Sequence, residues 1–384
     1  MLTAEGCAAR RKRLWNALPA ECDFLLIGAP EHLTYFAGLV VSPFVFRSTE
    51  AGAVLALKPD HATLIADDMI GPFLAASHTD EVVSPSWYNG KTSAPERRGL
   101  LVKTALNQLA AKFPGKRIGV ELGAVPSGIV EGLRSSRTDL EIVDLSPLIR
   151  PLRRQKHDDE IAAMRRSMKA GEAGHAAALN QLKPGMTELD AYRIIQNAAV
   201  DSLGEPAILY GDFASGPRTW LERGGSPTLR RIEKGDLILL DFSVIHANYR
   251  GDFTNTFAVG GGPTAEQQRL FEACVAALKA GESALVAGNP ARSVDQIVRR
   301  EFASLGLEKA FLSHSGHGLG LGHPEPPYFT SESSDTIEVG DVVAIEPGLY
   351  VNDVGGMRFE RNYLVTKSGF ESLSNHEIRI SQGS

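Results

Sequence analysis

Two copies of one short pattern each end in an acidic residue, and a second acidic residue follows each copy. Residues 232–241 (IEKGDLILLD) and residues 337–346 (IEVGDVVAIE) each read as a turn, an apolar run and a closing carboxylate. An acid closes each copy and another follows it, which gives Asp241 and Asp252 in the first copy and Glu346 and Glu360 in the second. The apolar runs indicate buried strands, where four gathered carboxylates would repel one another unless cations neutralised them. The repeat therefore predicts a metal site.

The spacing within the first copy predicts how two of these acids meet. Residues 237–245 and 249–259 are expected to form a hairpin with a tight turn at His246-Ala247. That turn would place Asp241 directly opposite Asp252, with Cβ atoms about 5 Å apart. Both carboxylates could then hold ions of one cluster.

The second copy can be aligned on the first by placing Val365 at Val259. Arg358 then takes the position of Asp252, and Glu360 lies two residues further along, on the same face because side chains alternate along a strand. Four surface acids at strand ends would be the alternative interpretation. Apolar neighbours argue against it, namely Leu239, Leu240, Ile345 and Phe359.

A histidine between glycines is the candidate fifth ligand. His317 lies in the segment 315–322 (SGHGLGLG), where glycines allow a sharp turn and a close approach of the backbone. Oxygen ligands favour Mn, Mg, Ca or Co, and one imidazole shifts the preference towards transition metals.

The elements that must position these residues follow one order twice, namely helix, helix and hairpin. The expected helix starts are the acidic run 158–160, Thr187 with Asp190, Thr264 with Gln267, and Ser293 with Gln296. The second hairpin is expected to pair residues 342–350 with residues 357–365. Two related halves packed about a pseudo-twofold axis, with helices on one face of a largely antiparallel sheet, give an α+β fold.

The first 150 residues alternate helix-like and strand-like segments and predict a separate α/β domain. Its expected helices are 4–17 and 96–113, and its expected strands are 23–28, 52–57, 62–66, 117–121 and 141–145. A stretch rich in Pro and Arg, residues 148–157, marks the boundary. The predicted domains are 1–150 and 155–384.

Composition excludes several classes of protein. The chain has 384 residues, 43% of them hydrophobic and 22% charged, which is ordinary for a globular protein. Its net charge of −6 argues against a nucleic-acid surface. Three cysteines without a CxxC pair argue against a disulfide scaffold, and no apolar stretch is long enough for a membrane span. A cytoplasmic location is expected.

Together the motifs resemble the creatinase, prolidase and methionine aminopeptidase family, whose catalytic domain has the pita-bread fold. The motif order is Asp, a second Asp in the same hairpin, Gly-His-Gly, Glu-Pro-Gly and Arg-hydrophobic-Glu. This chain matches it with Asp241, Asp252, 316–318, 346–348 and 358–360. The α/β segment before it points to the Xaa-Pro dipeptidase and aminopeptidase P branch, with a creatinase-type N-terminal domain.

The resemblance implies a dinuclear metallopeptidase that cleaves the bond before proline in short peptides. Asp241 would bind one ion, Asp252 and Glu360 would bridge both, and His317 and Glu346 would complete the second. The ions, with manganese favoured and cobalt or zinc as alternatives, would lie about 3.5–4 Å apart and hold a bridging hydroxide as nucleophile. Glu346 is the candidate proton relay. A homodimer is implied by the resemblance alone.

Three further residues have candidate roles. Arg358 would either brace the carboxylates or clamp a substrate carboxylate, the brace being preferred. The family pattern has a histidine seven residues after the ligand histidine and another four before it. Here His323 and His314 each stand one position away from the expected place, and a one-residue slip on a strand turns a side chain to the other face. A β-bulge at Pro324 could turn the side chain of His323 back towards the metal site.

These slips leave three hypotheses. The first is the Xaa-Pro peptidase, with His323, Glu346 and Arg358 as catalytic residues. The second is a C–N hydrolase or lyase of the same family that acts on a small non-peptide substrate. The third is a binding or adaptor protein on a retired enzyme scaffold, against which the complete ligand set argues.

Overall fold

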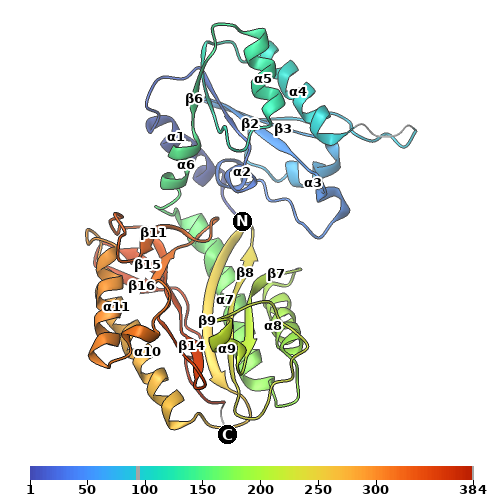
Figure 1. Ribbon diagram of the computed structural model, residues 1–384. Helices are drawn as coiled ribbons and strands as arrows, with labels where there is room; N and C mark the ends of the chain where they lie inside the picture. The colour runs from blue at the N-terminus through green and yellow to red at the C-terminus, as the bar shows by residue number, and fades with distance from the viewer. Residues whose placement is uncertain (92–95, 383–384) are drawn as a thin grey trace. The chain divides into compact units, whose positions relative to one another are not determined.

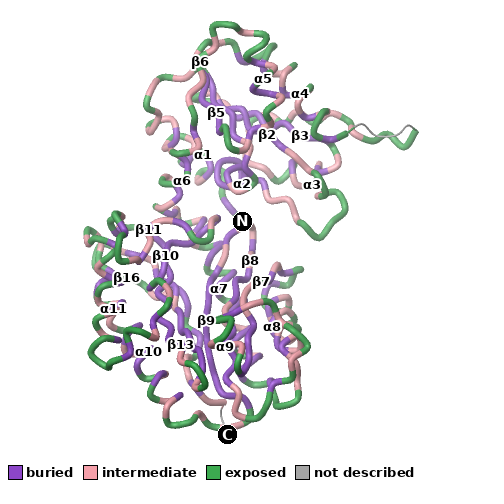
Figure 2. The backbone as a smooth tube through the Cα atoms, viewed as in Figure 1, coloured by how far each residue is buried: buried purple, intermediate pink, exposed green. Residues whose placement is uncertain are grey.

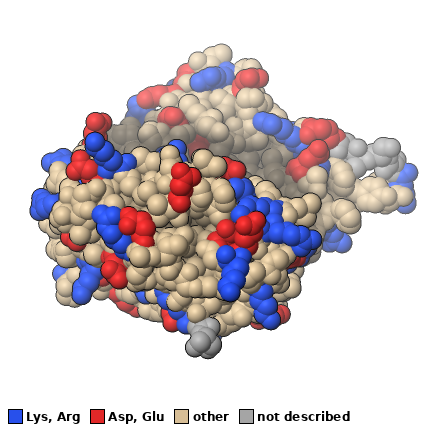
Figure 3. All heavy atoms as spheres, turned by 60° about the horizontal axis from the view of Figure 1, so that its bottom comes forward, with Lys and Arg blue, Asp and Glu red and all other residues tan. Residues whose placement is uncertain are grey.

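The computed structural model describes residues 1–91 and 96–382 and divides the chain into two compact units, Met1–Arg153 and Arg154–Ser384. Figure 1 shows the elements of each unit, and Figure 2 shows that the strands at their centres are buried. Along the described residues, no helix combines the length and the apolar character that crossing a lipid bilayer requires. On the face shown in Figure 3, basic and acidic side chains are interspersed.

The first unit is an α/β domain built on one mixed six-stranded sheet in the order β4-β3-β2-β1-β5-β6. The strands are β1 (Phe24–Ile27), β2 (Ala53–Lys58), β3 (His61–Ala66), β4 (Glu81–Val83), β5 (Arg117–Val120) and β6 (Glu141–Asp144). The helices are α1 (Ala4–Asn16), α2 (Pro30–Ala37), α3 (Gly71–Leu74), α4 (Arg97–Lys112), α5 (Ser127–Ser136) and α6 (Ser146–Leu152). Apolar residues of α4 and α5 pack on the sheet, which confirms the predicted α/β character.

The second unit contains the two expected halves. The first half has α7 (Asp158–Gln181), α8 (Glu188–Leu203), β7 (Ile208–Ser215), α9 (Arg218–Leu221), β8 (Leu237–His246) and β9 (Tyr249–Ala258). The second half has α10 (Ala265–Ser283), α11 (Arg292–Ser304), β10 (Gly316–Gly318), β11 (Glu325–Phe329), β12 (Val342–Ile345), β13 (Gly348–Val351), β14 (Gly355–Arg358), β15 (Arg361–Thr366) and β16 (Gly369–Ser372). Their pairings are antiparallel, as predicted.

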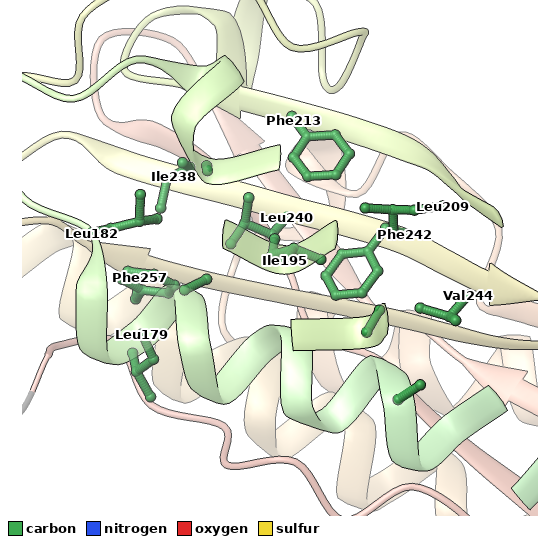
Figure 4. Close-up of a cluster of buried hydrophobic side chains, with 14 of the residues drawn as sticks. Leu179, Leu182, Ile195, Leu209, Phe213, Ile238, Leu240, Phe242, Val244 and Phe257 are labelled. Carbon is green, nitrogen blue, oxygen red and sulfur yellow. The ribbon is translucent and has the colours of Figure 1, made fainter. Parts of the chain in front are cut away.

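Strand alternation decides what each face of the sheet β7-β8-β9 carries. Ile238, Leu240 and Phe242 of β8 point into the apolar cluster formed with α7 and α8 (Figure 4). The alternate position Asp241 therefore points to the opposite face, together with its strand partners Asp212 on β7 and Thr254 on β9. The apolar core thus fixes the direction of the polar face.

The register of the first hairpin differs from the prediction. Ala247 and Asn248 both have positive φ, 49° and 65°, and form the turn between paired His246 and Tyr249. The predicted turn at His246-Ala247 is therefore wrong by one residue, because two consecutive residues with positive φ fit a hairpin turn whose twist matches its strands. Asp241 pairs with Thr254 and not with Asp252. The shift is two residues, so both acids remain on one face.

The second hairpin is interrupted where the prediction had two continuous strands. The pairs Ile345↔Arg361 and Gly348↔Arg358 belong to one register, and the ladder breaks between them. At the break, Glu346 N donates to Ser315 O and Glu360 N donates to Thr254 O, each at 3.0 Å. Glu360 thus bonds to β9 of the first half, whereas Glu346 bonds to the segment before β10 within the second half.

The helix starts are mostly as predicted. Thr187 and Thr264 form complete capping boxes with Asp190 and Gln267. The predicted cap at Ser293 is wrong, because α11 begins at Arg292 and the Ser293 hydroxyl donates to Pro290 O at 2.7 Å.

Candidate metal centre

The five predicted ligands line one cavity of about 530 Å³ in the second unit. Three overlapping groups of potential ligands lie there, with donor atoms of each group within 4.8 Å of one another. They are Asp241 with Asp252 and Glu360, then Asp252 with His317 and His323, and then His314 with His317 and Glu346.

The two aspartates come from neighbouring strands of the first half. Asp252 accepts a hydrogen bond from Ser243 Oγ at 3.2 Å, and the backbone of Asp252 exchanges two hydrogen bonds with the amide of Asn362. Asn362 lies on β15, so the second half holds the strand that carries Asp252. The aspartate position is therefore fixed from both halves.

His317 reaches the same point from β10. Gly316 has φ 147°, and a Cβ there would lie 2.1 Å from Ala344 O, so only glycine allows this close strand approach. The Nδ1 atom of His317 donates to Gly318 O at 3.0 Å, which leaves Nε2 towards the acids, 3.3 Å from Glu346 and 3.7 Å from Asp252. This tautomer is the one that a metal ligand needs.

Glu360 carries an unsatisfied buried oxygen. The residue is 1% exposed, and Oε2 accepts a hydrogen bond from Thr254 Oγ1 at 2.8 Å. Its Oε1 has no partner among the described residues. An unpaired buried carboxylate oxygen is costly, and a cation would relieve the cost.

The surroundings shift the pKa values of the four acids in different directions. Burial, reinforced by neighbouring carboxylates and opposed by Arg358, raises the pKa of Asp241 to about 7. Burial and the same repulsion raise the pKa of Glu360 well above its ordinary value. Burial also penalises Asp252 and Glu346, but hydrogen bonds from histidines outweigh it and lower both pKa values. The donor set thus fits divalent cations, which would replace the protons.

Both displaced histidines reach the cavity. His323 Nε2 lies 2.6 Å from Asp252 Oδ2, and His314 Nε2 lies 3.0 Å from Glu346 Oε1. Both residues lie in irregular segments beside β10 and β11, so strand parity does not govern their direction. A register shift does occur between these strands, where Gly318 pairs with Glu325 directly after His317 pairs with Tyr328.

Arg358 is a buried residue of the cavity lining and contacts Asp241 through Nη2. Its Nη1 donates to Tyr350 Oη at 2.9 Å and its Nε to Thr254 Oγ1 at 3.3 Å. These contacts favour the bracing role over a substrate clamp.

Sequence reasoning did not single out several residues of the cavity lining, namely Tyr210, Gly211, Asp212, Phe242 and Ser243. Three of them lie on β7, a strand that was not predicted. The alternation of apolar residues at 209 and 213 with polar residues at 210 and 212 was the available signal.

Two family profiles match the chain. The profile of the creatinase/prolidase N-terminal domain matches residues 10–155, and the profile of metallopeptidase family M24 matches residues 162–367.

Individual proteins are similar over much of the chain. An uncharacterised peptidase of Staphylococcus aureus (strain USA300) is 31% identical over 239 residues, which cover 61% of this chain and 66%, just under two thirds, of that peptidase. A Xaa-Pro dipeptidase of Pyrococcus horikoshii is 29% identical over 265 residues, 69% of this chain and 75% of that enzyme. The solved Xaa-Pro dipeptidase from Bacillus anthracis covers 99% of both chains at 22% identity with a TM-score of 0.82, which shows a shared fold.

Proposed function

This chain belongs to metallopeptidase family M24, and on that premise we propose that it hydrolyses the bond before proline in short peptides. The observation that supports this most is the convergence of Asp241, Asp252, His317, Glu346 and Glu360 on one cavity. The similarity to a Xaa-Pro dipeptidase over 69% of the chain supports the substrate class.

These five residues would hold two divalent cations, with manganese as our first choice and cobalt or zinc as alternatives. When bound, such cations acidify water and polarise a carbonyl group. Asp241 and Asp252, which lie on one face of the sheet, would set the position of the cations, and the unpaired Oε1 of Glu360 would become a ligand.

The remaining steps fall to side chains of the cavity. Glu346, held by His314 at 3.0 Å, would take a proton from the attacking water and pass it to the leaving nitrogen. His323 is 29% exposed at the side chain and would donate a hydrogen bond to the substrate. Arg358 would keep Asp241 in place.

The test is hydrolysis of Ala-Pro and of an Ala-Pro tripeptide by protein loaded with manganese or cobalt. We expect turnover that a chelator abolishes and that Glu360→Gln reduces together with the measured metal content. His61→Gln serves as control, because His61 lies on β3 of the first unit with its side chain 41% exposed. A fully metal-loaded protein that cleaves neither peptide would refute the proposal.

The alternative of a small non-peptide substrate rested on the displaced histidines. Since both imidazoles reach the cavity, no observation of the structure now favours it.

A further inference from the structure

Asp212 is an acid of the cavity to which no role has been given. It lies on β7 with Asp241 as its strand partner, so both side chains point to the same face of the sheet. It lines the same cavity as the proposed ligands, yet it belongs to none of the potential metal-binding groups.

The carboxylate of Asp212 is fixed through one oxygen. Oδ1 accepts a hydrogen bond from Gly225 N at 2.8 Å, whereas Oδ2 accepts none from the described residues. The nearest cationic group among the described residues, Arg358 Nη2, is 3.6 Å from Oδ2 and already contacts Asp241. The side chain is 42% exposed, and Gly224 leaves Oδ2 uncovered, because a Cβ at Gly224 would lie 2.4 Å from it.

The balance of charges in the cavity suggests what Oδ2 of Asp212 could bind. Two divalent cations would balance the four carboxylates proposed as ligands. Apart from the histidines, the charged residues left in the lining are then Asp212 and Arg358. Arg358 is buried, its guanidinium contacts Asp241, Tyr350 and Thr254, and it also lies 3.7 Å from Glu346. Of these two residues, Asp212 is the more exposed charge in the described lining, so it is the one that a substrate meets.

We propose that Asp212 binds a protonated nitrogen of the residue on the N-terminal side of the scissile bond. The inference rests on the proposed function and adds a specificity determinant to it. Because Asp212 and Asp241 are strand partners, a group held by Asp212 lies beside the proposed cation site. The α-ammonium of an unblocked peptide would lie there, and the side chain of an N-terminal Lys or Arg offers the same chemistry.

Asp212→Asn is the informative substitution, because the amide oxygen can still accept from Gly225 while the charge is lost. We would measure kcat and KM of the manganese-loaded protein for Ala-Pro, N-acetyl-Ala-Pro, Lys-Pro and Glu-Pro. A charge-assisted hydrogen bond predicts that the variant loses about ten- to hundredfold in kcat/KM for its amine substrates, mainly through KM. Hydrolysis of N-acetyl-Ala-Pro should change little.

The pattern of losses separates the two sources of the charge. Equal losses for Ala-Pro and Lys-Pro identify the α-ammonium, and a loss confined to Lys-Pro identifies the side chain. Unchanged ratios between the four peptides would overturn the inference while leaving the peptidase intact. Metal content and thermal unfolding must match the wild type, and Asp201→Asn, an exposed change on α8, is the matched control.

Binding provides a readout that does not require peptidase activity. Calorimetry with L-alaninamide and N-acetyl-alaninamide on the manganese-loaded protein should show tighter binding of the free amine. Asp212→Asn should remove that difference. A wild type that binds both compounds equally would overturn the inference, whether or not the protein cleaves Xaa-Pro peptides.

Discussion

At the scale of single residues, the four acids of the cavity differ in their hydrogen-bond partners and in the direction of their pKa shifts. Asp252 and Glu346 each lie within 3.0 Å of a histidine nitrogen, and their pKa values are lowered. Asp241 and Glu360 have raised pKa values because burial and repulsion dominate. Divalent cations that bind Asp241 and Glu360 should therefore displace protons from these acids.

Arg358 gives a prediction at this scale. Arg358→Lys keeps the charge but loses the planar group that contacts Asp241, Tyr350 and Thr254 together. We expect a ten- to hundredfold loss of metal affinity or of kcat/KM, about the usual effect of removing a partner of a ligand. Metal titration and peptide hydrolysis measure it. Arg269→Lys on α10, with the side chain 52% exposed, should behave as wild type.

At the scale of elements, helix caps give a matched pair of substitutions. Thr264 accepts from Gln267 N at 3.2 Å and caps α10, whereas Ser293 lies inside the first turn of α11. Thr264→Ala should lower the free energy of unfolding by about 1 kcal/mol. Ser293→Ala should change it by less than about 0.5 kcal/mol. Urea unfolding compares the two, and an equal loss would contradict the assigned helix starts.

Two stacked histidines beneath the sheet predict a pH dependence of stability. The rings of His175 on α7 and His376 have centroids 5.0 Å apart, and both residues are buried. Burial lowers the pKa of His376 to about 3 and that of His175 well below 6.5. As pH falls below about 6.5, both histidines become protonated in the unfolded chain but stay neutral in the folded chain. The free energy of unfolding should therefore decrease as pH falls from about 6.5 towards about 3.

The measurement that tests this prediction is the slope of the unfolding free energy against pH. Each histidine can contribute up to about 1.4 kcal/mol per pH unit. His376→Phe keeps an aromatic ring in the stack and should make the decline of unfolding free energy between pH 6.5 and 5 shallower by up to that amount. A variant with the slope of the wild type would show that His376 accepts a proton in the folded state.

At the scale of the whole molecule, all of the proposed ligands belong to the second unit. A cation that binds only the folded state stabilises it by about 2.7 kcal/mol at one hundred times the dissociation constant. Manganese should therefore slow amide hydrogen exchange in β8, β9, β10 and β15 and leave the sheet of the first unit unchanged. Equal slowing in both units would contradict the assignment of the site to one unit.

The sequence by itself predicted the two paired halves and the acids and histidine that are proposed as ligands. A buried strand has a period of two, so the apolar neighbours of Asp241 on β8 fix the face on which this acid lies. The two-residue error in the first hairpin preserved that face. The helix caps at Thr187 and Thr264 could also be predicted from the sequence, because each hydrogen bond joins residues that are three positions apart.

Tertiary structure alone decided the directions of side chains outside regular strands and the contacts between distant segments. The segment of His323 is held by the buried pair Lys156 and Glu325, whose Nζ and Oε1 atoms lie 2.8 Å apart across 169 residues of sequence. The breaks at Glu346 and Glu360 likewise depend on backbone partners in other segments, Ser315 and Thr254. Local periodicity carries no information about such contacts, because they join segments that are distant in sequence and form only when the chain has folded.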